Sequence, residues 1–394
     1  MPRILRILNR FNLGGPTYNA AYLSKYMPSE FETLLIGGQK AESEASSLHI
    51  TEDLGLDPIV IPTMLRELNP KKDYESYLKI KEIIADFKPD IVHTHASKAG
   101  ALGRLAAINS DVPHLVHTFH GHVFHGYFNP VKTKMYKTVE RYLAKKTDRI
   151  VTISNIQKTE LGVEHRICPL DKIEVIPLGF DLDRFQVNQE ENRNTFRIKY
   201  QLKEDTVAIG IIGRLVPIKN HELFLKGIQF IKKNSKIKIQ AFIIGDGESR
   251  NTIEEQAKKL GLSFDNKANT GVDILFTSWI KKVDAALSGL DLVALTSLNE
   301  GTPVSLIEAQ AAEKAIVTTN VGGIENVVLP NKSALLSEID DENGFCENLI
   351  KLVDDSIMRM EFSKAGKDFV FSNFHYNRLV KDTTELYHKI LDTQ

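Results

Sequence analysis

Two glutamates in the second half of the chain stand where the sequence pattern predicts a ligand site. Glu300 and Glu308 follow the buried-strand pattern of residues 292–295. The residues between them predict a loop and then a helix with Thr302 as its N-cap and Pro303 as its first residue. The free N–H groups of that helix end favour an anion such as a phosphate. Because two carboxylates would repel a bare phosphate, we expect them to bind neutral hydroxyls, as sugars supply. The alternative is a capped surface helix with solvated glutamates.

A pair of cations follows a second predicted strand. Gly213, Arg214 and Lys219 come after the apolar run of residues 208–212. Arginine can bind a diphosphate through its guanidinium fork and lysine as a point charge, while Gly213 allows the backbone to approach closely. The pattern therefore predicts a diphosphate site, and the alternative is two exposed cations that flank a turn.

Glycine turns follow two more of the predicted strands. Gly245 and Asp246 end the strand of residues 238–244, where the backbone could pass close to a nucleobase. In the first half of the chain, Gly14 and Gly15 open a helix after the first strand, and such a helix end favours an anion. Their spacing is not the Gly-x-Gly-x-x-Gly of dinucleotide-binding proteins, which disfavours a nicotinamide enzyme.

Histidines are concentrated in one stretch of the first half. Seven of the twelve lie between His93 and His125. No His-x3-His helical pattern accompanies them, and alternating strand positions point to opposite faces, so we expect no metal site and consider buried structural histidines the alternative. His120 stands just past a strand end and before a glycine, with His122 two residues on. Lys98 opens a helix after another strand, so it is expected at the same edge of the sheet.

A basic segment follows these histidines. Its cations are spaced by three, four and four residues and so share one helix face; they are Lys134, Lys137, Arg141 and Lys145. An aromatic loop, residues 123–128, lies immediately upstream. A basic face beside exposed aromatic residues suits docking on an anionic bilayer, and the alternative is a solvated helix over an aromatic core loop.

Along the chain, short apolar runs alternate with longer stretches of helical periodicity. The expected strands span residues 4–8, 34–36, 59–61, 91–93, 115–118 and 150–153 in the first half, and 207–212, 238–244, 273–276, 292–295 and 316–318 in the second. Strands separated by helices predict parallel α/β sheets.

The polar stretch of residues 186–197 is the expected linker between two Rossmann-like domains. We place the first domain at residues 1–184 and the second at 185–374. The terminal helix, about residues 375–394, is expected to pack back on the first domain.

Length and composition restrict the class of protein. The 394 residues suggest two to three domains. A net charge of -1 argues against a nucleic-acid binder. Only Cys168 and Cys346 are present, which fits a reducing compartment such as the cytoplasm and excludes a disulfide framework. No segment reaches the roughly 18 apolar residues that span a bilayer, so any membrane contact is expected to be peripheral.

Taken together, the motifs resemble a known family. Gly213-Arg214 with Lys219, the Gly245-Asp246-Gly247 turn, and Glu300-Gly301-x-Pro303 with Glu308-Ala309 occur in one order and spacing. They are similar to the retaining nucleotide-sugar glycosyltransferases of family 4. The resemblance implies the GT-B fold, in which two Rossmann-like α/β domains with parallel sheets face a central cleft.

The resemblance also implies roles for individual residues. Arg214 and Lys219 would bind the donor diphosphate, Glu300 the hydroxyls of the donor sugar and Glu308 those of the ribose. His120, or His122 if the register is shifted, would contact the donor sugar, and Lys98 an acceptor phosphate. The remaining donor-binding residues would be Gly14, Gly15, Gly213, Gly245, Asp246, Gly301, Thr302, Val304 and Ser305. No metal and no cofactor are expected, because the two cations would do the work of a metal.

The function implied is transfer of a sugar from a nucleoside-diphosphate donor, with UDP expected, to a hydroxyl of a saccharide acceptor. Residues 93–107 and 117–125 resemble the bacterial branch that builds capsule, exopolysaccharide or lipopolysaccharide on polyprenyl diphosphate carriers. That branch implies a cytoplasmic protein held peripherally on the inner face of the cytoplasmic membrane. A GT-B nucleotide-sugar epimerase and a non-catalytic sugar-nucleotide-binding protein are the alternatives.

Overall fold

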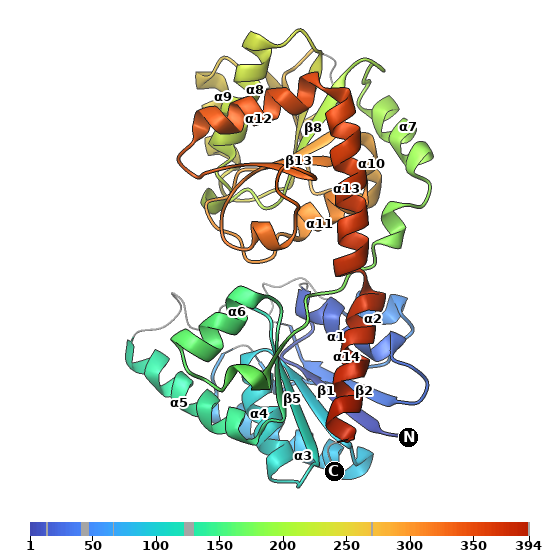
Figure 1. Ribbon diagram of the computed structural model, residues 1–394, viewed down its shortest axis with the longest axis vertical. Helices are drawn as coiled ribbons and strands as arrows, with labels where there is room; N and C mark the ends of the chain where they lie inside the picture. Colours follow the sequence, from blue (N-terminus) through green and yellow to red (C-terminus); the bar gives the residue numbers. More distant parts are fainter. Residues whose placement is uncertain (13–14, 41–46, 66, 122–129, 269–270, 393–394) are drawn as a thin grey trace. The chain divides into compact units, whose positions relative to one another are not determined.

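The chain folds as two compact units. The computed structural model describes residues 1–12, 15–40, 47–65, 67–121, 130–268 and 271–392, and of residues 130–132 it describes the backbone alone. One unit comprises Met1–Phe180 with Phe374–Gln394, and the other comprises Asp181–Asn373 (Figure 1).

The first unit is built on a parallel sheet of seven strands in the order β3-β2-β1-β4-β5-β6-β7. The strands are β1 (Arg3–Leu8), β2 (Glu32–Gly38), β3 (Ile59–Ile61), β4 (Ile91–His95), β5 (His114–Phe119), β6 (Arg149–Thr152) and β7 (Ile173–Val175). The helices are α1 (Gly15–Tyr26), α2 (Leu48–Asp53), α3 (Pro70–Phe87), α4 (Ser97–Ile108), α5 (Pro130–Lys146), α6 (Asn155–Thr159) and α14 (Tyr376–Leu391).

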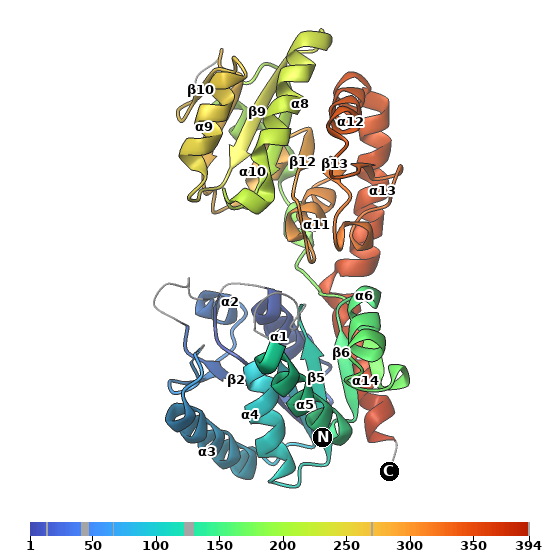
Figure 2. The same ribbon diagram turned by 90° about the vertical axis from the view of Figure 1, so that its left-hand side faces the viewer.

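Helices cover both faces of this sheet (Figure 2). Leu5 and Val92 belong to the apolar cluster on the side of α3 and α4. Their strand neighbours Ile4 and Ile91 point to the opposite face and pack against Tyr387 and other residues of α14. Burial on both faces explains why these strands read as continuous apolar runs.

Backbone hydrogen bonds hold the terminal segment on the first unit. Phe180 donates to Phe374 O at 2.8 Å, and Tyr376 donates back to Phe180 O at 3.0 Å. The ring of Tyr376 stacks on that of Tyr26 with centroids 4.4 Å apart. These contacts place the change of unit between Phe180 and Asp181, a few residues before the boundary that we predicted from the polar stretch.

The second unit repeats the architecture with a parallel sheet in the order β10-β11-β9-β8-β12-β13-β14. The strands are β8 (Val207–Ile212), β9 (Ile239–Ile244), β10 (Phe264–Asp265), β11 (Ile274–Ser278), β12 (Leu292–Leu295), β13 (Ala315–Thr319) and β14 (Ala334–Ser337). The helices are α7 (Gln189–Lys199), α8 (His221–Asn234), α9 (Arg250–Lys259), α10 (Val283–Gly289), α11 (Val304–Ala311), α12 (Glu342–Asp354) and α13 (Ser356–Phe374).

The interpretation of residues 186–197 as a linker is wrong. Most of this stretch forms helix α7, which packs on α10. Phe196 anchors the helix so closely that a Cβ on Gly289 would lie 2.1 Å from its ring, and Arg193 pairs with Asp291 at 2.7 Å. A helix with one apolar anchor and a charged outer face looks like a linker because few of its residues are apolar.

Candidate functional site

Two loops of the second unit are joined where their strands end. The loop after β8 carries Lys219, and the loop after β12 carries Glu300. Thr296 Oγ1 donates to the carbonyl of Lys219 at 2.9 Å, and Leu298 N donates to Ile218 O at 2.8 Å. These bonds bring the two predicted site residues together although they are 81 positions apart in the sequence.

Lys219 and Glu300 form an ion pair, in which Nζ donates to Oε1. Ser297 Oγ donates to the same carboxylate oxygen at 2.6 Å. The side chains are only 22% and 11% exposed, so the pair is partly sheltered from water. The cluster therefore offers a cation and an oriented carboxylate side by side, which suits a ligand with phosphate and hydroxyl groups.

Arg214 lies on the same loop as Lys219 but is not paired. Its side chain is exposed, and among the described residues it has no hydrogen-bond or ion-pair partner. The turn that presents it is held by Leu215 N, which donates to Asp246 O at 3.0 Å. Asp246 in turn accepts a hydrogen bond from Gly247 N through its side chain at 2.9 Å. The structure therefore leaves Arg214 as an open cation.

The predicted glycines allow two loops of the protein to touch. A Cβ on Gly245, whose φ is +147°, would lie 1.8 Å from the carbonyl oxygen of Gly213. We predicted Gly245 as a place where the backbone could approach a nucleobase. What the structure shows beside it is the loop after β8, and contact with the protein alone requires glycine there.

Gly322 and Gly323, after β13, were missed by the sequence interpretation. A Cβ on Gly323 would lie 1.8 Å from Gly301 O, and one on Gly322 would lie 2.0 Å from Glu300 O. Gly323 N also donates to Glu300 O at 3.0 Å. The signal was available, because a Gly-Gly pair follows the apolar strand pattern of residues 316–318. This third loop fixes the backbone of Glu300 and Gly301.

Helix α11 begins one residue later than predicted. Pro303, with φ -72° and ψ 94°, is the N-cap, and Val304 is the first helical residue, so the prediction of Thr302 as N-cap is wrong. The cap has no side-chain hydrogen bond, and Leu306 N donates to Pro303 O at 3.1 Å. Among the described residues, the N–H groups of Val304 and Ser305 have no acceptor and are available to a ligand. A Cβ on Gly301 would meet no atom of the described residues within 4 Å, so the fold itself does not demand a glycine there.

Glu308 has a partner that the sequence did not predict. Arg184 Nη2 donates to its Oε1 at 3.0 Å, and the guanidinium lies 4.7 Å from the centre of the Phe185 ring. Burial nevertheless raises the pKa of Glu308, and the Arg184 charge only partly opposes this shift. Glu308 is thus a sheltered carboxylate, and its partner Arg184 is itself 45% exposed.

In the first unit, His95 and His120 meet where β4 and β5 end. His95 Nδ1 lies 2.9 Å from His120 Nε2, and the rings are stacked with centroids 5.2 Å apart. Burial lowers the pKa of His120 to about 3, and burial with neighbouring positive charge lowers the pKa of His95 well below its ordinary value. Both rings are therefore neutral near pH 7. His122 and Gly14 lie outside the described residues.

Lys98 is not the open cation that we predicted as a phosphate contact. Its Nζ donates to Leu65 O at 2.8 Å and to Glu67 O at 2.6 Å, and it pairs with Asp73 at 2.5 Å. These two hydrogen bonds and the ion pair hold the Lys98 ammonium group on the protein itself. Gly15, in contrast, is the first residue of α1, as predicted.

The cations of α5 differ in hydrogen bonding and in exposure to solvent. Arg141 is anchored, since Nε donates to Arg166 O at 3.0 Å and Nη2 to His165 O at 2.7 Å. Lys134 and Lys145 are exposed. The aromatic loop that we predicted beside this helix lies outside the described residues.

The described part of the chain contains no group of three His, Cys, Asp or Glu side chains that could hold a metal ion. None of its helices is long and apolar enough to cross a membrane.

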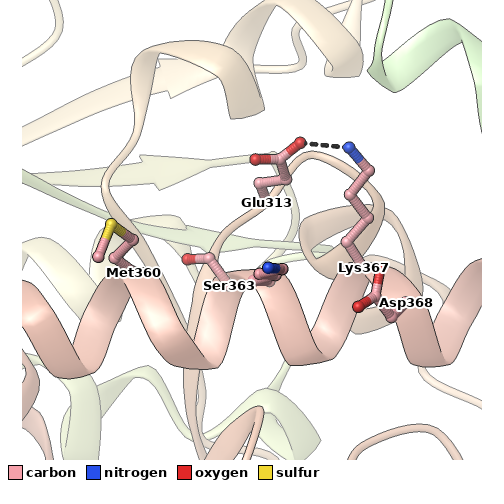
Figure 3. A pocket seen from close by; sticks show the side chains of 6 residues that line it. Glu313, Met360, Ser363, Lys367 and Asp368 are labelled. Atoms are coloured by element: carbon pink, nitrogen blue, oxygen red, sulfur yellow. Dashed lines mark hydrogen bonds and ion pairs between the residues drawn. The ribbon is translucent and has the colours of Figure 1, made fainter.

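One pocket of the second unit contains none of the predicted site residues (Figure 3). It lies against α13, where Lys367 pairs with Glu313 at 2.6 Å. Glu313 follows the C-terminal end of α11, whereas the candidate site lies at the N-terminal end of that helix. The pocket is therefore separate from the site.

The chain matches known families and proteins over most of its length. Residues 14–184 match the family described as Glycosyltransferase Family 4, and residues 192–369 match Glycosyl transferases group 1. A UDP-Gal:alpha-D-GlcNAc-diphosphoundecaprenol alpha-1,3-galactosyltransferase of Escherichia coli is 30% identical over 329 residues, which are 83% of this chain and 82% of the relative. The capsular polysaccharide biosynthesis glycosyltransferase CapM of Staphylococcus aureus is 26% identical over 84% of this chain and 85% of its own length.

Solved structures share the fold across both units. HepE of Anabaena in complex with UDP has a TM-score of 0.79 at 15% identity, over 99% of this chain and 100% of that one. A glycosyltransferase of Rickettsia africae has a TM-score of 0.77 at 19% identity, over 100% and 99%. Each unit is an α/β fold with a parallel sheet, both halves match glycosyltransferase families, and one relative is 30% identical. The chain is therefore a glycosyltransferase that belongs to family 4 and has the GT-B fold.

Proposed function

We propose that the enzyme transfers a sugar, with retention of configuration, from a UDP-sugar to a hydroxyl of a saccharide carried on a polyprenyl diphosphate. The Escherichia coli relative is named for a UDP-Gal donor and a diphosphoundecaprenol-linked acceptor, and it aligns with 83% of this chain. The proposed process is bacterial cell-surface polysaccharide synthesis. The single observation that carries the proposal is the contact of Lys219 with Glu300 beside the uncapped end of α11.

The donor would be held by complementary groups of the second unit. Arg214 and Lys219 would bind the diphosphate, together with the free N–H groups of the first turn of α11. Glu300 would accept hydrogen bonds from the donor sugar. Glu308 would accept them from the ribose, in exchange for part of its contact with Arg184.

The same groups would stabilise the charge that develops during reaction. The acceptor oxygen would attack the anomeric carbon as the bond from that carbon to the diphosphate oxygen breaks, on the same face of the sugar. The acceptor proton would pass to the leaving phosphate oxygen. Lys219 and Arg214 would balance the negative charge on the diphosphate, so the proposal requires neither a metal nor a cofactor. His120 would contact the donor sugar as a neutral imidazole.

The experiment that tests this function is a screen of UDP-sugars with a GlcNAc-diphosphoundecaprenol acceptor. Mass spectrometry and NMR would identify the product and the anomeric configuration of its new linkage. We expect one donor to give an α-linked disaccharide from an α-linked donor. An inverted linkage would contradict the retaining mechanism, and interconversion of the free UDP-sugar without acceptor would identify an epimerase instead.

We also propose that α5 docks the enzyme peripherally on an anionic membrane surface, which would be the inner face of the cytoplasmic membrane. Its outer face carries Met135, Val139 and Tyr142, which are 54%, 40% and 54% exposed. Their spacing of four and three residues puts them in one apolar stripe. The exposed Lys134 and Lys145 lie beside this stripe. An apolar stripe with adjacent cations suits the interface of an anionic bilayer.

A basic pocket beside α5 supports the same surface. Its volume is about 590 Å³, and its lining combines apolar groups with four cations; these are Arg141, Lys145, Arg166 and Lys172. Such a lining would accept the phosphate of a lipid headgroup.

Vesicle sedimentation tests the membrane proposal. We expect binding to anionic but not to zwitterionic vesicles at low salt, and weaker binding after Lys134→Glu with Lys145→Glu. Met135→Ser with Tyr142→Ser should remove the part of the binding that salt does not release. Arg141 is left unchanged because it holds two backbone carbonyls. Equal sedimentation of all variants would show that this face of α5 is merely solvated.

A further inference from the structure

In the first unit, polar side chains lie on one face of the sheet, toward the carboxyl ends of its strands. Ile4, Ile91 and Val116 form the apolar part of this face against α14. Two positions further along each strand the face becomes polar, with Arg6 on β1, His93 on β4 and Thr118 on β5, all buried. Further toward the carboxyl edge stand His95 and His120. A polar row therefore leads from α14 to the edge of the sheet where His120 lies.

Hydrogen bonds hold the base of this row. Arg6 Nη2 donates to Tyr387 Oη at 3.3 Å. The Tyr387 hydroxyl is hydrogen-bonded to His93 Nδ1, 2.6 Å away. His93 Nε2 is hydrogen-bonded to Thr118 Oγ1 at 2.7 Å, and the tautomer of His93 decides which atom donates in these two bonds. The ring of His93 is thus fixed at both nitrogens.

The ring of His95 stacks on the ring of His93. The His93 and His95 rings are stacked with centroids 4.3 Å apart and planes 25° apart. The burial of His93 and the nearby Arg6 charge lower the pKa of His93 well below its ordinary value, and His95 experiences the same influences. Because charged forms are disfavoured, His95 and His120 share one hydrogen in the bond between His95 Nδ1 and His120 Nε2.

A single shared hydrogen couples the two outer nitrogens. If His95 Nδ1 carries it, His120 Nδ1 is a donor and His95 Nε2 an acceptor. If His120 Nε2 carries the hydrogen instead, His120 Nδ1 is an acceptor and His95 Nε2 is a donor. Among the described residues, neither His120 Nδ1 nor His95 Nε2 has a hydrogen-bond partner, and both atoms are buried. In either state one outer nitrogen is a donor and the other is an acceptor.

We propose that His95 is a positioning residue that sets the tautomer and orientation of His120, so that His120 Nδ1 can bond a sugar hydroxyl. The relevance of this pairing to catalysis rests on the proposed function of His120. The hydrogen bond between His95 and His120 does not rest on that function, because it is present whatever His120 binds.

Two substitutions separate the hydrogen bond from the stacking. His95→Asn places an amide where Nδ1 was and can still bond His120, whereas His95→Phe keeps a stacked ring without that bond. We expect His95→Phe to lower kcat about 10–100-fold, the usual range for losing an orienting partner, with little change in KM for the donor. His95→Asn should retain most of the activity. His117→Phe is the matched control, because His117 is equally buried but bonds Thr94 on the opposite face.

Ring-nitrogen NMR of the protein labelled with 15N-histidine gives a readout independent of activity. We expect one tautomer of His120 in the wild type, His95→Asn and His117→Phe, and a mixture in His95→Phe. If His95→Phe does not fold, His95→Gln replaces it, since its amide reaches toward Nε2 instead of Nδ1. An unchanged His120 tautomer in the folded variant would overturn the proposal.

The activity of His120→Ala separates the two claims. Full activity of that variant would refute the proposed role of His120 in the reaction, while the tautomer measurement would still decide whether His95 positions it. Loss of activity in His95→Asn equal to that in His95→Phe, in folded proteins, would show that stacking alone matters and would overturn the hydrogen-bond role.

Discussion

The two units place different chemistry at the carboxyl edges of similar parallel sheets. The second unit presents the ion pair of Lys219 with Glu300 and the open cation Arg214. The first unit presents neutral rings, His95 and His120, that exchange a single hydrogen bond. Charge suits an anionic diphosphate, whereas neutral donors and acceptors suit sugar hydroxyls. The comparison shows that one fold can offer two kinds of ligand site, because the strand ends supply the positions and the loop residues supply the chemistry.

Ion pairs also serve different purposes in the two units. In the first unit, Arg104 Nη2 donates to Glu140 at 2.6 Å between α4 and α5, and the Arg104 side chain is 0% exposed. No ligand is proposed for this pair. In the second unit, water can reach the Lys219–Glu300 pair. We therefore expect the first pair to matter for stability and the second for binding.

The largest effect should come from breaking the buried pair of the first unit. Glu140→Ala leaves the Arg104 charge buried without a partner and should lower the free energy of unfolding by about 3–5 kcal/mol. Glu300→Ala should cost only about 1 kcal/mol, since Lys219 can turn toward water. Urea unfolding measured by circular dichroism reports both units, while the fluorescence of Trp279 reports the second. The double variant Arg104→Met with Glu140→Leu is the control and should restore most of the stability; equal losses in Glu140→Ala and Glu300→Ala would break the comparison.

The next largest effect concerns the cations of the second unit. Arg214→Ala and Lys219→Ala should each weaken UDP binding by about 1.5–3 kcal/mol, because each removes a charge-assisted hydrogen bond. The loss should be larger for Lys219, because its removal also leaves the Glu300 carboxylate unbalanced. Isothermal titration calorimetry measures both, with Lys226→Ala as the control, a lysine paired with Glu342 on the same unit. Unchanged UDP affinity in both variants would refute the diphosphate site.

A pair of glycine substitutions sharpens the distinction between fold and site. Gly323→Ala puts a Cβ 1.8 Å from Gly301 O and should lower stability by more than about 1 kcal/mol, the range of strained or overpacked positions. Gly301→Ala meets no described atom, so it should leave stability within about 0.5 kcal/mol of wild type. It should nevertheless weaken UDP binding, because the new methyl group faces the proposed ligand. Thermal unfolding and calorimetry on both variants test this, and normal UDP affinity in Gly301→Ala would remove that residue from the site.

The smallest effect is a pH dependence at Glu308. Its pKa is raised above the ordinary 4.5. The ionised form accepts hydrogen bonds from the ribose hydroxyls more strongly than the neutral form, because those bonds are charge-assisted. UDP affinity should therefore fall as the pH is lowered through that raised pKa. Glu308→Gln should lose this step, while titration of UDP itself affects both proteins equally. Arg184→Met should move the step to higher pH, since the Arg184 charge opposes the shift. Identical pH profiles of wild type and Glu308→Gln would contradict the assignment.

Much of the fold follows from local patterns. The apolar runs at residues 207–212 and 292–295 are strands β8 and β12, because a strand buried on both faces needs a continuous apolar stretch. The short edge strands β7, β10 and β14 were not predicted, since two to four residues carry little periodic signal. Helix α7 was taken for a linker because its single large apolar contact, Phe196, is outweighed by charged neighbours.

Local sequence patterns identify the charged and polar residues of the site and the loops that carry them, because strand ends and helix starts are encoded by neighbouring residues. The partners of these residues depend on the folded structure. Lys219 forms an ion pair with Glu300, Lys98 with Asp73, and Arg184 with Glu308. These outcomes depend on strand order and loop contacts between residues far apart in the chain. Sequence spacing does not contain those distances, and the energy of a charge depends on the burial that they create.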